Sequence, residues 1–313
     1  MLRATSIALQ VIAGLALICA LGIRARHSAT TPEAKTNGGL FRFADWTMTA
    51  YAGDWDLPEH DEETVRKTFT LSGADRSLEI DNVSGAIEVV GADGDQVQVV
   101  VNEKYRAESK EKLAEARKRI TLETTQDGNS LRLYVDGPFQ WQDDGFLGFR
   151  DARGYCGSMD FQVQVPRETR LTLKTVDGSV HVRDVHGDFS VHSVSGAITM
   201  EGLTGSGSAR TVNGAVRVKF RENPRQSSDF GSVNGSVDLH FAPKLNADFR
   251  LQTFNGSVFS DFAMEAPSAE VEHEGMKTIY RAHRDSGGRV GTGGPEIRVE
   301  TLNGAIRILE NHE

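Results

Sequence analysis

Three histidines and two aspartates gather between residues 181 and 192, and side chains of these types could hold a metal ion. They are His181, Asp184, His186, Asp188 and His192. Imidazole and carboxylate groups are common zinc ligands. The chain is built of repeats, however, and other repeats place Thr, Arg or Asp where His181 and His192 stand. Because these positions carry no consistent ligand, we expect neither a metal site nor a bound cofactor here.

Outward-facing carboxylates could instead form an acid and base pair for the cleavage of sugars. The chain has 44 Asp and Glu residues, but no repeat gathers them more densely than the others. No phosphate-binding loop, nucleophile elbow or HExxH motif occurs, and the glycine-rich stretch 287–294 has no lysine. These observations favour a non-catalytic protein over the alternative, a glycan-active β-helix enzyme.

The charge balance argues against nucleic acid as a partner. The chain has 313 residues, with 35 Lys and Arg against 44 Asp and Glu, and its formal net charge is −9. Binding to a phosphate backbone calls for a basic surface. The two cysteines are Cys19, in an apolar N-terminal stretch, and Cys156. Cys156 has no disulfide partner in the remainder of the chain, which must therefore be held together by packing.

The apolar stretch at 4–23 has twenty residues without a charge, which is long enough to cross a bilayer. Arg24 and Arg26 follow it, and the context for cleavage after Gly22 is poor, so we favour an uncleaved anchor over a cleaved signal peptide. Either one would export the remainder of the chain. We expect a signal or anchor at 1–28, a polar linker and aromatic segment at 29–65, and one domain at 66–313.

Seven copies of one short pattern organise this domain: an apolar residue, a polar residue, glycine, a small residue, and Val or Ile. Examples are VSGAIEV at 83–89, VNGAVRV at 212–218 and LNGAIRI at 302–308. The repeat-turn glycines are Gly85, Gly178, Gly196, Gly214, Gly235, Gly256 and Gly304. From Gly178 to Gly256 they are spaced by 18, 18, 21 and 21 residues, which indicates a true structural period.

Equivalent positions of the repeats predict which side chains are buried. The residue two before the glycine is always Val, Phe or Leu, and the residue two after it is Val or Ile, so we expect both to face inward. The residue three after the glycine varies from Glu88 to Phe259 and Arg307, so we expect it to face solvent. The glycine and its neighbours predict a tight turn, in which glycine supplies positive φ and the small residue permits close stacking.

Two architectures can use such repeats. In a meander, each Asn-Gly closes an antiparallel hairpin. In a solenoid, each repeat forms one coil, and like residues stack at about 4.8 Å. We favour a solenoid with coils of 18 to 21 residues, because a hairpin gives no reason for the residue after the glycine to be small seven times.

A charged helix is expected at 104–119, where Glu108 and Lys112, and Glu115 and Arg119, stand at helical spacing. Two aromatic clusters lie outside the repeats, one between residues 41 and 55 and one in an insertion at 136–155. The second supplies the candidate partner-binding residues Phe139, Trp141, Phe146, Phe149 and Tyr155. Such clusters suit a binding surface for a protein or a glycan, and they also suit a cap over the end coil of a solenoid.

The repeats and their flanking segments resemble the bacterial putative-adhesin family, a β-strand-repeat domain of unknown function related to the head GIN domain. The resemblance covers roughly residues 66–309 and includes the opening at 67–101, the charged helix, ITLETTQDGNSLRLYV at 120–135 and FQVQVPRETRLTLKTVDGSVHV at 161–182. It implies a right-handed β-solenoid held outside the cytoplasm, and it implies no established enzyme activity.

The sequence therefore predicts an all-β protein: a right-handed β-solenoid with an N-terminal transmembrane or signal helix and one short charged helix. We expect a non-catalytic cell-envelope protein, anchored in the membrane and facing the periplasm or the cell exterior, or secreted if the signal is cleaved. Its partner would be a protein or a glycan. An accessory or sensor role in an envelope-stress system is a further alternative.

Overall fold

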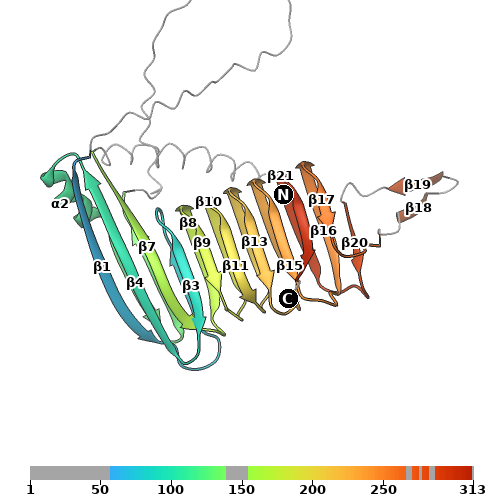
Figure 1. Cartoon of the computed structure of the whole chain (residues 1–313), viewed down its shortest axis with the longest axis horizontal. Coiled ribbons are helices and arrows are strands. Elements are labelled where there is room, and N and C mark those ends of the chain that lie inside the picture. Colours follow the sequence, from blue (N-terminus) through green and yellow to red (C-terminus); the bar gives the residue numbers. More distant parts are fainter. Residues whose placement is uncertain (1–56, 139–153, 266–269, 275–276, 282–285, 312–313) are drawn as a thin grey trace, which may run out of the picture. The chain divides into compact units, whose positions relative to one another are not determined.

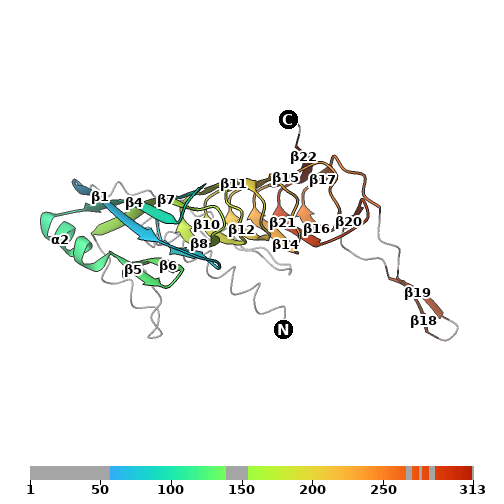
Figure 2. The same cartoon turned by 90° about the horizontal axis from the view of Figure 1, so that it is seen from below.

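Two long β-sheets make up most of the part of the chain that the structure describes. The computed structural model describes residues 57–138, 154–265, 270–274, 277–281 and 286–311. The two sheets belong to one compact unit that runs from Leu57 to Glu313. Figure 1 and Figure 2 show the strands arranged as two facing layers. The predicted all-β class is confirmed for these residues.

Within the described residues, each of the two sheets has ten strands. Sheet A has the order β1 (Glu59–Thr70), β4 (Gln96–Ala107), β7 (Tyr155–Pro166), β3 (Ile87–Ala92), β9 (Val180–Arg183), β11 (Ile198–Leu203), β13 (Val216–Phe220), β15 (Val237–Phe241), β22 (Ile306–Glu310) and β17 (Val258–Ser260). Sheet B has the order β20 (Ser286–Val290), β16 (Ala247–Asn255), β21 (Glu296–Asn303), β14 (Ser228–Asn234), β12 (Gly207–Asn213), β10 (Phe189–Ser195), β8 (Arg170–Asp177), β2 (Ser77–Asp81), β6 (Ser130–Asp136) and β5 (Thr121–Asp127). A separate hairpin joins β18 (Glu270–Glu274) to β19 (Lys277–Arg281).

Each repeat contributes one strand to each sheet, so that it forms one coil. The strand before the glycine lies in sheet B and the strand after it lies in sheet A, as β12 and β13 do. Equivalent strands pair in parallel: Ile198 of β11 is in register with Val180 on one side and with Val216 on the other. A meander of hairpins would pair the two strands of one repeat antiparallel, so the pairing supports a β-solenoid-like fold.

The order of the coils differs from their order in the sequence. Val237 of β15 pairs with Ile306 of β22, and Ile306 pairs in turn with Val258 of β17. The coil nearest the C-terminus therefore lies between the coil of Gly235 and the coil of Gly256. The regular spacing of 21 residues between these two glycines does not make their coils neighbours. The chain leaves the stack after β17 and returns to fill the place between them.

Burial confirms one predicted inward column and corrects the other. Six of the seven residues two after the glycine are 0% exposed: Ile87, Val180, Ile198, Val216, Val237 and Ile306; the seventh, Val258, is only half-buried. The residues two before the glycine do not face the core: Phe254 is 79% exposed and Leu302 is 40% exposed, and the five valines of this column are half-buried. The predicted solvent column has one exception, Asp238, which is 6% exposed and lies between Arg217 and Arg307.

The charged helix is shorter than expected. It is α2 (Lys110–Arg119), and the hydroxyl of Ser109 caps it by accepting from the amide of Lys112 at 3.3 Å. Residues 104–107 continue strand β4, because Tyr105 and Ala107 are buried at strand spacing. Within the described part of the chain, no helix is long and apolar enough to cross a membrane. The apolar stretch at 4–23 lies outside the described residues.

Replacing Val216 by Asp tests the inward column. The side chain is 0% exposed, so the variant buries a carboxylate without a partner, and we expect a loss of several kcal/mol in the free energy of unfolding. Thr199→Asp, one residue after the inward column on β11, is the control and should change stability by about 0.5 kcal/mol or less. Chemical denaturation measures both, and equal small losses would refute the inward assignment.

Candidate functional site

The glycines of the repeats lie at one corner of the coils, where backbones of neighbouring coils touch. A Cβ atom added at Gly196 would stand 2.0 Å from the carbonyl oxygen of Gly178, and one added at Gly304 would stand 2.1 Å from that of Gly235. Real Cβ atoms do not approach a carbonyl so closely, so only glycine fits. Positive φ explains Gly85, with φ of 116°, but the need for glycine at this corner comes from close approach rather than from turn geometry.

A column of buried hydroxyl groups supports this corner, and the sequence analysis missed it. The residue three before each glycine is Thr or Ser in six of the seven repeats, and Asn82 in the other. Thr211 donates its hydroxyl to the carbonyl of Gly196 at 2.9 Å, and Ser232 donates to that of Gly214 at 2.8 Å. The same bond joins Ser193 to Gly178, Thr301 to Gly235 and Thr253 to Gly304.

A ladder of asparagine side chains runs beside the glycines on the exposed side. The amide of Asn234 donates to the side-chain oxygen of Asn213 at 2.8 Å, that of Asn303 donates to Asn234 at 2.8 Å, and that of Asn255 donates to Asn303 at 2.9 Å. The ladder needs equivalent positions in contact, as a solenoid provides. Each amide also keeps a second N–H, which can bond solvent or a partner.

The hydroxyl column explains why the residue two before each glycine faces outward. Successive residues of a strand point to opposite faces, so an inward hydroxyl places the next side chain outside. We call these outward side chains the valine row; its members, in spatial order, are Val83, Val176, Val194, Val212, Val233, Leu302 and Phe254. The row crosses seven neighbouring coils, or six spacings of about 4.8 Å. It forms an apolar stripe on the outside of sheet B.

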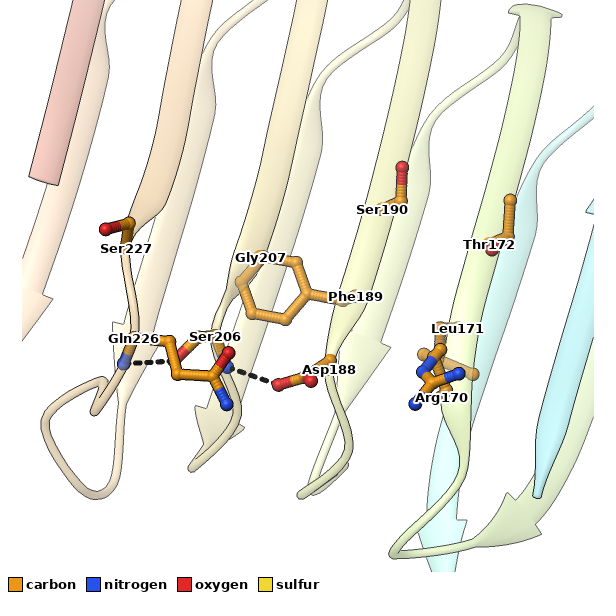
Figure 3. A pocket seen from close by; sticks show the side chains of 10 residues that line it. All are labelled: Arg170, Leu171, Thr172, Asp188, Phe189, Ser190, Ser206, Gly207, Gln226 and Ser227. Atoms are coloured by element: carbon orange, nitrogen blue, oxygen red, sulfur yellow. Dashed lines mark hydrogen bonds between the residues drawn. The ribbon is translucent and has the colours of Figure 1, made fainter. Parts of the chain in front are cut away.

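A shallow groove lies at the other end of the sheet B strands, away from the valine row. Two adjoining hollows, of about 250 and 390 Å³, share Phe189, Gly207 and Ser227. Figure 3 shows the first, with the aromatic ring of Phe189 beside Gly207. The amide of Ser206 donates to Asp188 at 3.1 Å, and the amide of Gln226 donates to the hydroxyl of Ser206 at 3.1 Å. Hydroxyl groups and two arginines, Arg170 and Arg298, complete a polar rim.

An ion-pair network lies on the outer face between the groove and the valine row. Arg210 donates to Asp229 with Nη2 2.6 Å from Oδ2, and it reaches across Gly231 to Glu300 at 3.3 Å. Burial, with the neighbouring Arg210 and Lys174, lowers the pKa of His192, so its imidazole is neutral at neutral pH. All three carboxylates of the groove have partners: Asp229 is bound to Arg210, Asp188 accepts from a backbone amide, and Glu296 lies 2.9 Å from Arg250.

The structure does not bring the three histidines together. His181 lies on β9 in sheet A and His192 on β10 in sheet B, while Nδ1 of His186 lies 3.2 Å from Glu168. Among the residues that the structure describes, no group of three or more His, Cys, Asp or Glu side chains could hold a metal ion.

The predicted aromatic surface falls largely outside the structure. Phe139, Trp141, Phe146 and Phe149 lie outside the described residues, so their binding role stays a prediction. Tyr155 begins β7 and is 5% exposed, so it packs in the core. Cys156, next to it, is an exposed free cysteine.

Residues 156–308 match the Toastrack DUF4097 domain. The match covers six of the seven repeats and confirms the resemblance to a bacterial putative-adhesin domain of unknown function. A comparison with curated proteins finds no match.

Solved structures of similar proteins include two from Clostridium sporogenes and Bacteroides fragilis. A putative cell adhesion protein from Clostridium sporogenes is 12% identical, with a TM-score of 0.43 and coverage of 80% of this chain and 100% of that one. A putative adhesin from Bacteroides fragilis is 11% identical, with a TM-score of 0.35 and coverage of 80% and 97%.

Gly196→Ala tests the close approach at the glycine corner. Its Cβ would meet the carbonyl of Gly178 at 2.0 Å, so we expect the free energy of unfolding to fall by about 3 kcal/mol. Gly231→Ala is the comparison within sheet B, because its Cβ would lie 3.2 Å rather than 2.0 Å from the nearest carbonyl oxygen, and its loss of stability should be clearly smaller. Thermal and urea unfolding measure both; a stable Gly196→Ala variant would contradict the corner geometry.

Proposed function

We propose that the domain is a non-catalytic binding module of an exported cell-envelope protein, and that the valine row is its contact surface. The observation that carries the proposal is the row itself. Seven outward side chains are apolar in seven successive coils, although their position does not bury them in the core. An apolar stripe that the fold does not need for its own packing suits a partner.

The chemistry of the corner favours an extended, uncharged partner. The positions from the valine row to the small residue after the glycine hold Val, Leu, Phe, Asn, Ser, Gly and Ala, with Asp177 as the one charged residue in the seven copies. A glycan chain, or a polypeptide segment without charges, offers alternating apolar and hydrogen-bonding groups of this kind. The net charge of −9 disfavours nucleic acid.

Three further parts of the proposal rest on sequence. The apolar stretch at 4–23 supports export and attachment to the membrane, with the domain facing the periplasm or the cell exterior. The resemblance to putative adhesins supports a right-handed coil and a binding role rather than catalysis. An accessory or sensor role in envelope stress would use the same contact surface.

Site-specific photo-crosslinking in the native cells tests the contact surface. A photoreactive amino acid at Val194 or Val212 should give a covalent adduct, whether the partner is a glycan or a protein, while Thr199 on the outer face of sheet A is the matched control. Replacing the neighbouring member of the valine row by Lys should reduce the yield of the adduct at least about tenfold, because a charge then enters an apolar contact. No adduct specific to the row, with the variants folded, would overturn the proposal.

Membrane attachment has its own test. We expect the native protein to fractionate with membranes and to retain its N-terminus, because twenty apolar residues precede Arg24 and Arg26 without a good cleavage site. N-terminal sequencing and intact mass measure this. A soluble form that begins near Ile23 would show cleavage and secretion instead.

A further inference from the structure

The coil made by β16 and β17 ends the stack. In sheet A, β17 is the last strand and pairs with β22 on one side. In sheet B, β20 covers β16, but only along residues 247–251. Among the residues that the structure describes, no strand pairs with the outer edge of residues 253–260, whose sequence is TFNGSVFS.

The end coil presents groups that every other coil uses for stacking. At the other corners, the glycine amide donates to the next coil, as Gly235 does to Asn303 at 3.0 Å and Gly304 to Asn255 at 3.1 Å. No such bond forms from the amide of Gly256 within the described residues. Val258 is only half-buried, although its counterparts are 0% exposed, and Phe259 is 54% exposed. The end coil therefore exposes the backbone and apolar groups that the other coils bury against a neighbouring coil.

Edge strands elsewhere in the two sheets carry charges that oppose pairing. At the other end of sheet A, six of the 12 residues of β1, EHDEETVRKTFT, are Asp, Glu, Lys or Arg. The edge strand β5 carries Glu123 and Asp127, and β20 carries Arg289. Charges on an edge strand prevent its pairing with another chain. The strand β17, VFS, has no charge and no proline.

We propose that two copies of the chain join end to end through this coil, with their β17 strands antiparallel across a two-fold axis. Sheet A then continues from one copy into the other. A second copy fits better than a charged strand, because its own β17 offers an equally uncharged edge. A head-to-tail contact would place Phe259 against the charged edge of β1, whereas a two-fold contact places uncharged edges together and closes the assembly.

Light scattering and sedimentation of the full chain in detergent, with the protein mass separated from that of the detergent, test the dimer. We expect the wild-type chain to change from one copy to two as its concentration rises. Phe259→Lys should raise the dissociation constant at least about tenfold, because two lysines then meet across the axis. Thr199→Lys is the matched control, since Thr199 holds the equivalent position on β11, which is paired on both sides.

Mixing two variants of opposite charge shows whether residue 259 acts through contact between the copies or through a change in folding. Phe259→Lys and Phe259→Glu should each be monomeric, and their mixture should recover the dimer because unlike charges then face each other. A wild-type chain that stays monomeric would overturn the proposal, as would a dimer that Phe259→Lys leaves intact or that Thr199→Lys weakens equally. None of these outcomes depends on the valine row, so the proposed binding function would stand or fall separately.

Discussion

Close backbone contact at the corner glycines is the constraint on which the rest of the structure depends. At six of the seven glycines, an added Cβ would lie 1.8 to 2.3 Å from the carbonyl oxygen of a neighbouring corner glycine. That distance excludes every side chain at this point. It also brings the preceding residues close enough for the hydroxyls of Thr211 and Ser232 to reach carbonyls of the adjacent coil. Parallel pairing in both sheets follows, because equivalent residues of successive coils lie in register.

The same constraint shapes the surface. An inward hydroxyl three residues before the glycine places the next side chain outside, whatever its type. Solvation alone would favour polar residues there, yet the seven positions hold five valines, a leucine and a phenylalanine. On the outer face of sheet A, by contrast, the equivalent row changes from Glu88 through His181 to Arg307. The difference between the two outer rows is the physical basis for assigning a partner to sheet B.

Much of this fold could be predicted from the sequence, and the errors have physical causes. The glycine period predicted the coils, and the Val and Ile column after the glycine predicted the core. The column before the glycine was misassigned because apolar type was read as burial, whereas the inward position belongs to hydroxyls that satisfy buried carbonyls. The place of the last coil could not be predicted, since spacing along the chain does not reveal that residues 296–310 return between two earlier coils. The groove near Phe189 depends on Gly207, which no repeat pattern marks.

Hydrogen exchange at the corner glycines tests stacking most directly. The amide of Gly196 donates to Asn213 at 3.0 Å, and that of Gly235 donates to Asn303 at 3.0 Å. In stacked coils these amides are released only when the coils separate, so we predict exchange as slow as that of the central strands β12 and β13. In a meander of hairpins the same glycines would lie in exposed turns. Fast exchange at Gly196, Gly214 and Gly235, beside slow exchange in the flanking strands, would contradict the stacked corner.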